Sequence, residues 1–285
     1  NWMDLLRLSF KYNIPESNIF QIIYDFSVHF CPELKGSNIS FEKSILNSLN
    51  SKSHILCISQ KTRTDLLSIS NIEPNKVGVF YPGLRNDFDK ENNFKIDINK
   101  FLNIPRNSKY ILCLSTLEPR KNLKTSLKIF EKIILNFNSN NLYLVLAGAK
   151  GWDKIDEQIN SFPNNIKRKI IITGYVDDNI VYHLYKSSLC FLYPSFYEGF
   201  GLPPLEAMAA GTPVIISNRG SLSEIFGKAT KVFDPHDISG MTSKIHDLYL
   251  NIRKRDEEAN KLKKFSKLFT WKKSSEEIVK FINQF

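Results

Sequence analysis

Cysteines and long apolar runs are both scarce in this sequence. The four cysteines, Cys31, Cys57, Cys113 and Cys190, are far apart, and no C-x-x-C pair or cluster of cysteine and histidine accompanies them. Metal-binding and disulfide-stapled classes are therefore weakly supported, and a cytoplasmic protein is the simplest expectation. The longest apolar runs fall well short of the roughly 20 residues that a transmembrane helix needs. No membrane-spanning helix is expected.

Acidic residues are outnumbered by basic ones, and the formal net charge is +10. Much of the excess lies in NIRKRDEEANKLKKFSKLFTWKK, residues 251–273. Two interpretations stay open: a solvated helix face, or attraction to an anionic substrate or membrane, where each basic residue contributes about 1 kcal/mol. The membrane interpretation predicts peripheral association at the inner face of the membrane. Because no recognition motif with interleaved aromatics occurs, nucleic acid is not an expected partner.

The length and composition are those of a globular protein. A chain of 285 residues, of which 42% are hydrophobic, can bury one large core or two ordinary ones. The first residue is Asn1 rather than methionine, and no basic-then-apolar leader follows it. This start predicts a processed or truncated boundary.

From residue 110 onward, short β-rich runs alternate with segments of helical period, which is typical of parallel sheets covered by helices. Strands are expected at 110–116, 141–148, 169–176, 189–195 and 213–217. Helices are expected at 126–137, 154–162, 179–188, 202–210, 238–254 and 274–285. The pattern predicts a doubly wound Rossmann-like domain with at least five parallel strands.

The first hundred residues show only part of such a pattern. Strands are expected at 19–27, 54–60 and 76–83, and helices at 41–53 and 61–70. This corresponds to the second half of an α/β unit without its opening strands. The predicted fold is therefore α/β, a complete C-terminal Rossmann-like domain preceded by a partial one. The expected segments are a partial domain at 1–98, a linker at 99–108, the complete domain at 109–270, and a helix at 271–285 that packs back towards the N-terminal domain.

Two motifs follow strands of the predicted C-terminal sheet, where open parallel sheets bind ligands. LEPRKN places Arg120 and Lys121 at one strand end, and FYEGFGLPPLE places a glycine turn and a helix start at another. The N–H groups and dipole of a helix start attract anions, and two cations would complete a phosphate clamp. Gly199 and Gly201 would let the backbone approach a ligand closely. The strand ends therefore predict a phosphate site.

The second motif also carries two carboxylates, Glu198 on the loop and Glu206 on the helix. A carboxylate beside a phosphate clamp would be repelled by the phosphate, so both are expected to bind hydroxyl groups. A ligand with a diphosphate between two polyols is a nucleotide sugar. We expect Glu206 to accept hydrogen bonds from the ribose, as the acidic residue of dinucleotide sites does, and Glu198 to hold the donor sugar.

These motifs together resemble the retaining glycosyltransferases of family four, which have two facing Rossmann domains, the GT-B architecture. The resemblance rests on EPRKN and EGFGLPPLEAMAAGTPVIIS, continues through ITGYVDD, SNRGSLSEIFGKA and VFDP, and covers residues 105 to 285. The segments YDFSVHFCPE, ISQKTRTDLL and VFYPG resemble the second half of the family's acceptor domain. The EPRKN variant is similar to a subgroup of bacterial mannosyl- and related transferases that build cell-surface polysaccharides.

The resemblance implies a role for each matching residue. Arg120 and Lys121 would bind the diphosphate and stabilise charge on the departing nucleotide. Glu198 would contact the transferred hexose, and Glu206 would bind the ribose. The base would lie against Tyr175 and Val176, and the sugar and phosphate would be lined by the backbone of Gly199, Phe200, Gly201 and Leu202.

The acceptor side is less well specified by the resemblance. Its candidates are Asp25, His29 and Gly83, and the chain has Tyr24-Asp25 where relatives often show His-Asp. The family works without a metal ion, so no metal or other cofactor is expected. The pair Asp177–Asp178 is interpreted as the N-cap of a helix.

The expected activity is transfer of a hexose, with mannose as the first guess, from a GDP- or UDP-linked donor to a saccharide or lipid-linked acceptor. An alternative is a donor-binding fragment or inactive partner subunit that binds the nucleotide sugar without transfer. A third class, a sugar-nucleotide epimerase or a phosphorylase with the same architecture, is disfavoured by the combination of EPRKN and the two glutamates.

Overall fold

The computed structural model describes residues 20–34, 54–85, 88, 96–137 and 139–285. The helix expected at 41–53 lies outside these ranges. The chain forms two compact units. The first unit comprises the residues up to Gly83 together with 197–200 and 269–285, and the second comprises 84–196 and 201–268.

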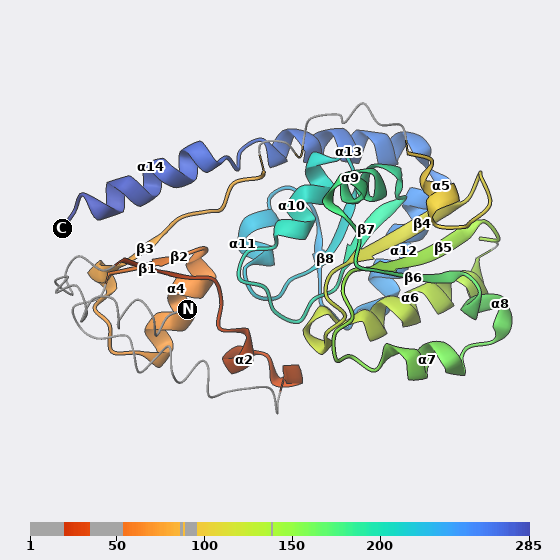
Figure 1. Ribbon diagram of the computed structural model, residues 1–285, viewed down its shortest axis with the longest axis horizontal. Coiled ribbons are helices and arrows are strands. Elements are labelled where there is room, and N and C mark those ends of the chain that lie inside the picture. The colour runs from red at the N-terminus through yellow and green to blue at the C-terminus, as the bar shows by residue number, and fades with distance from the viewer. Residues whose placement is uncertain (1–19, 35–53, 86–87, 89–95, 138) are drawn as a thin grey trace. The chain divides into compact units, whose positions relative to one another are not determined.

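In the ranges that the structure describes, the second unit is built around one sheet of six parallel strands (Figure 1). The strands are β4 (Lys109–Leu114), β5 (Leu142–Ala147), β6 (Ile170–Gly174), β7 (Cys190–Tyr193), β8 (Val214–Ser217) and β9 (Val232–Phe233). Their order across the sheet is β6-β5-β4-β7-β8-β9, the doubly wound order, which reverses between β4 and β7. The carboxyl ends of β4 and β7 therefore mark the switch point at which such sheets bind ligands. The five expected strands are confirmed, and β9 adds a sixth.

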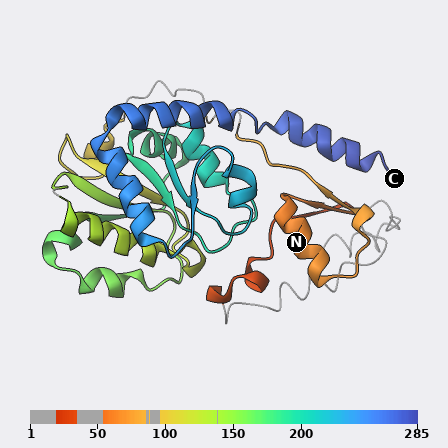
Figure 2. The same ribbon diagram turned by 180° about the vertical axis from the view of Figure 1, so that it is seen from behind.

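Helices cover both faces of this sheet (Figures 1 and 2). One group that packs together is α6 (Leu123–Asn136), α7 (Ile155–Ser161) and α12 (Ile238–Leu250). The other is α9 (Asp178–Ser187), α10 (Leu202–Ala209) and α13 (Ile252–Ser266). Shorter helices are α5 (Ile98–Phe101), η4 (Pro119–Lys121), α8 (Asn164–Lys167) and α11 (Leu222–Phe226).

The core of the second unit follows from the apolar pattern of its strands and of α6. The side chains of Leu123, Leu127, Phe130 and Ile133 recur at helical spacing and are all buried. They join a cluster with the inward side chains of β4 and β5. Each buried side chain of this kind contributes roughly 1.5 to 3 kcal/mol. The sheet is thus a firm platform for the loops at its carboxyl edge.

Within its described residues, the first unit contains three parallel strands in the order β1-β2-β3. They are β1 (Phe20–Ile23), β2 (His54–Cys57) and β3 (Val77–Val79). Its longer helices are α4 (Gln60–Ile69) and α14 (Trp271–Ile282), and its shorter ones are α2 (Ser27–Phe30), η2 (Pro32–Leu34) and η3 (Pro74–Lys76). Both α4 and α14 contact β3. The C-terminal helix thus packs against N-terminal residues, in the direction expected from the sequence.

The unit boundaries differ from the segments expected at 1–98, 99–108 and 109–270. The N-terminal segment of the first unit ends at Gly83, and the stretch expected as a linker belongs to the second unit. Its side chains Ile98, Leu102 and Ile104 are buried. The Asn99 Nδ2 also donates hydrogen bonds to backbone carbonyls of residues 105, 106 and 108. Apolar residues spaced among polar ones pack this segment onto the domain, which its polar composition concealed.

The single helix expected at 238–254 is two helices, α12 and α13. The break falls at Asn251, whose φ and ψ of −115° and 86° are not helical. Its side-chain oxygen accepts a hydrogen bond from the Lys254 N–H at 3.2 Å and so caps α13. An asparagine inside an apparently continuous helical pattern was the signal for this boundary.

All four cysteines are buried. Three of them, Cys57, Cys113 and Cys190, lie in runs that were expected to be strands. Cys31, Cys57, Cys113 and Cys190 are all free thiols. Burial raises the pKa of Cys57 and that of Cys113 to about 12. These thiols therefore stay protonated and behave as small apolar side chains.

The basic segment at 251–273 is paired with neighbouring carboxylates over much of α13. Ion pairs join Arg253 to Glu257 at 3.0 Å and Lys254 to Asp247 at 2.5 Å. Such pairs are typical of a solvated helix face. In the part of the chain that the structure describes, no helix has both the length and the apolar character needed to cross a membrane.

Candidate functional site

The loops that follow β4 and β7 are tied together at the switch point. Asn122, at the end of η4, has a left-handed backbone with φ of 55°, which asparagine tolerates. Its Nδ2 donates hydrogen bonds to the carbonyls of Pro194 at 3.0 Å and Pro235 at 3.2 Å. The Arg120 carbonyl accepts from the Phe196 N–H at 2.8 Å. Asn122 was not among the predicted site residues, although EPRKN contains it, and it fixes the loop that carries them.

The two predicted cations lie on this loop, and each side chain is held by a neighbour. Arg120 Nη2 is 2.6 Å from Glu118 Oε1, with both side chains largely buried. Lys121 Nζ donates to the Tyr193 hydroxyl at 2.7 Å. Glu118 and Tyr193 were not predicted. They orient the cations at the ends of β4 and β7, where diphosphate binding by Arg120 and Lys121 stays a prediction.

The start of α10 has the expected glycine turn but offers fewer N–H donors than a normal helix start. Gly201 has φ of 100°, and a Cβ there would lie 2.7 Å from Leu222 Cδ2. Pro203 and Pro204 occupy the first turn and have no N–H. Since a helix start normally leaves four N–H groups free, two of the four are missing here. The dipole remains, but the backbone anion site is weaker than the motif suggested.

A cavity of about 320 Å³ opens at the carboxyl ends of β4, β5 and β6 within the second unit. It brings together three residues predicted to bind the nucleotide, Tyr175, Val176 and Glu206. Its remaining lining residues are Arg85, Leu114, Ser115, Thr116, Gly148, Ala149, Asp178 and Val181. A Cβ on Gly148 would lie 2.0 Å from the Ser115 carbonyl oxygen. Glycine there lets the loops after β4 and β5 meet at the cavity wall.

Glu206 is the acidic group of this cavity, and its environment sets its charge. Burial raises the pKa of Glu206 to about 7, and the nearby Arg85 charge and a hydrogen bond from Tyr185 partly oppose that rise. The Tyr185 hydroxyl donates to Glu206 Oε2 at 3.3 Å. Near neutral pH the carboxyl group is therefore close to half ionised. Ionised, it can accept hydrogen bonds from ligand hydroxyls.

Arg85 and Asp178 form the charged rim of the same cavity. Arg85 Nη1 lies 2.5 Å from Asp178 Oδ2, and the guanidinium lies 5.4 Å from the centre of the Phe88 ring. Arg85 was missed because it lies in the segment expected as the partial N-terminal domain, 1–98, whereas the structure assigns it to the second unit. Asp177 holds the N-cap position of α9, as expected, but its side chain makes no capping hydrogen bond. Asp178 pairs with Arg85 instead of capping the helix.

The predicted donor-sugar residues are divided between the units. Glu198, Gly199 and Phe200 belong to the first, and Gly201 and Leu202 to the second. Glu198 is buried, with a relative exposure of 6%. A Cβ on Gly199 would be 2.1 Å from the Tyr24 carbonyl oxygen, so glycine is needed there for packing, and the predicted contact of Gly199 with a ligand stays a prediction.

The acceptor-side candidates lie in the first unit. Asp25 Oδ1 accepts a hydrogen bond from the Ser27 N–H at 2.9 Å, just after β1. His29 is exposed, with its ring 4.7 Å from that of Phe30. A Cβ on Gly83 would lie 2.1 Å from the Trp271 nitrogen. Gly83 is thus required by packing against α14, and acceptor-side roles for Asp25, His29 and Gly83 stay predictions.

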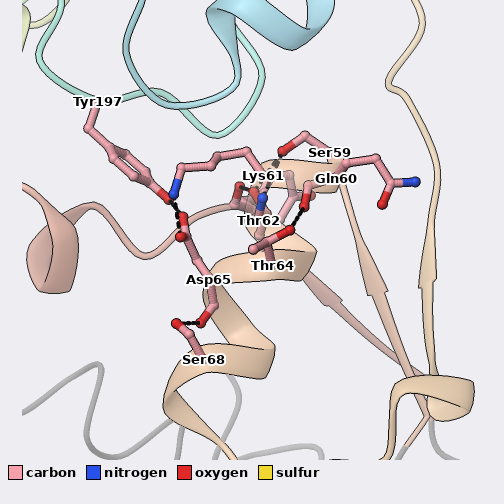
Figure 3. Close-up of polar contacts among 9 residues, drawn as sticks. Ser59, Gln60, Lys61, Thr62, Thr64, Asp65, Ser68 and Tyr197 are labelled. Carbon is pink, nitrogen blue, oxygen red and sulfur yellow. Dashed lines mark hydrogen bonds and ion pairs between the residues drawn. The ribbon is translucent and has the colours of Figure 1, made fainter.

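Next to Glu198, a buried polar network joins Tyr197 to α4 (Figure 3). The Tyr197 hydroxyl donates to Asp65 Oδ2 at 2.5 Å, and Lys61 pairs with the other oxygen of this carboxylate. Sequence reasoning missed this network because its members are 132 positions apart. The Asp65 in ISQKTRTDLL and the tyrosine before Glu198 carried no local signal of their pairing.

Within the described ranges, no three cysteine, histidine, aspartate or glutamate side chains gather as a metal ion would require.

The family described as Glycosyl transferases group 1 matches residues 94–268, more than half of the chain. The chain belongs to the group 1 glycosyltransferases. The expected resemblance is confirmed.

Two bacterial relatives of this group 1 glycosyltransferase are named O-antigen chain mannosyltransferases. It is 32% identical over 228 residues to O-antigen chain mannosyltransferase B of Escherichia coli, covering 78% of this chain and 58% of the relative. It is 24% identical to O-antigen chain mannosyltransferase RfbU of Salmonella typhimurium, covering 79% and 59%. The chain thus spans just under three fifths of the length of these relatives.

The fold is similar to that of solved structures. The crystal structure of Anabaena HepE in complex with UDP and glucose matches all of this chain and 76% of its own, with a TM-score of 0.80 and 16% sequence identity. The predicted α/β class with GT-B architecture is confirmed.

Proposed function

We propose that this group 1 glycosyltransferase moves a hexose from a nucleoside diphosphate sugar to a saccharide or lipid-linked acceptor, with retention, in the synthesis of a cell-surface polysaccharide. The observation that carries the proposal is the cavity that gathers Tyr175, Val176 and Glu206 inside the domain matched by the family. Mannose is the first candidate hexose, and GDP-mannose the first candidate donor, because both O-antigen relatives are named mannosyltransferases.

The cavity supports a separate binding site for each part of the nucleoside. Tyr175 is 75% exposed at its rim, and Val176 is buried in its wall. A base can therefore stack against the tyrosine ring while the valine side excludes water. The ionised Glu206 carboxylate would accept hydrogen bonds from the two ribose hydroxyls.

The diphosphate would bind at the ends of β4 and β7. Arg120 and Lys121 would stabilise the charge that develops on the departing nucleotide. Glu118 and Tyr193 hold these cations in place before the donor arrives. Preorganised charges cost no rearrangement during the reaction, so this arrangement favours breaking the bond between sugar and phosphate.

The reaction would pass through an oxocarbenium-like state, with the leaving phosphate oxygen taking the proton of the acceptor hydroxyl. Neither Glu198 nor Glu206 would act as a nucleophile, so the acid and nucleophile pair of glycosidases is the wrong comparison. Neither a metal ion nor another cofactor is required by this scheme.

The proposed location is cytoplasmic, with peripheral binding to the inner face of the membrane. Sedimentation of the protein with anionic vesicles, compared with neutral vesicles, tests this membrane binding.

A panel of GDP- and UDP-hexoses tests the proposal directly. GDP-mannose should raise the melting temperature as its concentration increases, because a ligand that binds only the folded state stabilises it. Adding saccharide acceptors should then release the nucleotide. Binding without release by any donor and acceptor supports the alternative, a donor-binding protein that does not catalyse transfer. Absence of binding to every nucleotide sugar contradicts both functions.

The two glutamates should separate in the same assays. Glu206→Ala should weaken the binding of bare GDP. Glu198→Ala should leave GDP binding unchanged and reduce the rate of sugar transfer. Glu157→Ala, an exposed glutamate on α7, is the matched control and should change neither. Equal affinity of the Glu206 and Glu198 variants for GDP would show that Glu206 does not hold the ribose.

A further inference from the structure

The loop that carries Glu198 is anchored by a buried tyrosine and aspartate (Figure 3). Tyr197 and Asp65 are each 3% exposed, and their hydroxyl–carboxylate hydrogen bond measures 2.5 Å. In Figure 3 the Tyr197 ring points towards α4, and the Lys61 side chain extends over the same carboxylate. Burial, and next the hydrogen bond to Asp65, raise the pKa of Tyr197 well above its usual range. The hydroxyl therefore remains a donor at any physiological pH.

Asp65 is itself held in place by α4. This helix begins at an N-cap serine, Ser59, whose side chain accepts from the Thr62 N–H at 3.0 Å. Lys61 is one turn before Asp65 and pairs with Asp65 Oδ1. The Lys61 ammonium also lies 5.3 Å from the centre of the Phe30 ring. The carboxylate that receives the Tyr197 hydroxyl is thus fixed on a capped helix.

The loop is held at two further points, so its backbone has little freedom. Gly199 packs against the Tyr24 carbonyl, where a Cβ would be 2.1 Å from the oxygen. The Phe200 ring lies 5.8 Å from that of Phe269, in an edge-to-face arrangement. Glu198 lies between these fixed points. The backbone on either side of Glu198 is therefore held by contacts of Tyr197, Gly199 and Phe200.

We propose that Tyr197 and Asp65 are positioning residues for Glu198, holding its carboxylate where the transferred sugar must bind. The inference rests on the proposed function, because it needs a donor sugar as the partner of Glu198. Nucleotide binding belongs to the cavity around Glu206 in the other unit. Breaking the hydrogen bond between Tyr197 and Asp65 should therefore weaken the contact of Glu198 with the sugar and leave nucleotide binding unchanged.

Tyr197→Phe removes the hydroxyl and leaves the ring. Tyr110→Phe is the matched control, because Tyr110 is also buried and its hydroxyl donates to the Leu184 carbonyl at 2.6 Å, on the platform of the sheet. The full chain is compared by calorimetry with GDP and GDP-mannose, with UDP and UDP-glucose as the second pair, and by transfer rate. Thermal unfolding of each variant records the structural cost.

Tyr197→Phe should lower kcat about 10- to 100-fold, the range for a small misplacement of a reacting group. Its affinity for the bare nucleotide should stay within about twofold of wild type, since other residues bind it. Tyr110→Phe should lower the melting temperature without this loss of kcat. Asp65→Asn should repeat the Tyr197→Phe pattern. The proposal is overturned if Tyr197→Phe and Tyr110→Phe have the same kcat. It is also overturned if Tyr197→Phe loses nucleotide affinity together with kcat.

A double-mutant cycle separates positioning from general packing. If Tyr197 acts through Glu198, Tyr197→Phe should add little to Glu198→Ala in the affinity gained from the hexose, since coupled residues are not additive. Additive losses overturn the proposal. A wild-type chain that binds the nucleotide sugar no more tightly than the bare nucleotide also overturns it, whereas a chain that binds no nucleotide overturns the proposed function itself.

Discussion

Protonation of Glu206 should control nucleotide binding near neutral pH. The pKa of Glu206 in the free protein is about 7, raised by burial. Ribose hydroxyls are donors, so they favour the ionised carboxylate, and affinity should be full above pH 7 and decrease as the pH is lowered. At pH 6 about one molecule in ten is ionised, so Kd should rise about tenfold from pH 8 to pH 6, or about 1.4 kcal/mol.

The assay is calorimetric titration with GDP-mannose between pH 6 and 8. A nucleotide sugar is preferred to GDP because a terminal phosphate itself titrates near pH 6, roughly. Glu206→Gln, which cannot ionise, should bind more weakly at pH 8 and show no such slope. A wild-type Kd that is constant over this range, or an equal slope in Glu206→Gln, would refute the assignment of this carboxylate to the ribose.

Folding stability should respond with the opposite sign. The folded pKa of Glu206 is above its unfolded value of 4.5, so protonation stabilises the folded state fully below pH 4.5, and this stability is lost as the pH rises through 7. The difference amounts to roughly 3 kcal/mol. Without ligand at pH 8, Glu206→Gln should therefore melt at a higher temperature than wild type. A lower melting temperature would contradict this sign.

Two backbone positions give further predictions, each with a matched control measured by thermal unfolding. Gly201→Ala should lower the free energy of unfolding by about 1 to 3 kcal/mol, and by more than Gly174→Ala does. Both glycines have positive φ, but an added Cβ would be crowded by Leu222 at Gly201 and would have no atom within 4 Å at Gly174. Equal losses would exclude the crowding. Asn122→Ala should cost about 1 to 3 kcal/mol more than Asn103→Ala, since both have positive φ and Asn122 also donates two buried hydrogen bonds. A similar loss for both would show that backbone strain alone matters.

The sheet was predictable because its strands are local patterns. Apolar runs such as those of β5 and β7 are buried along almost their whole length, and the motifs that follow β4 and β7 are adjacent in sequence to those runs. Once the strands are parallel, their carboxyl ends meet at one edge. Arg120 and Lys121 could therefore be placed beside the second motif without coordinates.

The partners of the site residues were not predictable in the same way. Arg85 reaches Asp178 across 93 positions, and Asn122 reaches the Pro235 carbonyl across 113. Such pairs have no periodicity, because each depends on how separate elements pack. The interpretation of residues 99–108 as a linker was wrong for this reason, since polar composition is visible in the sequence and the burial of Leu102 and Ile104 is not.

The sequence by itself determined the α/β class, the strand ends that carry the motifs, and the family to which they belong, because periodicity and short motifs are written along the chain. Tertiary structure decided the rest. It divided the YEGFG loop between two units, bonded Tyr197 to Asp65, and gave Glu206 its pKa of about 7. Burial and contacts between distant segments exist only in the folded chain, and they set both the backbone position of the loop that carries Glu198 and the charge of Glu206.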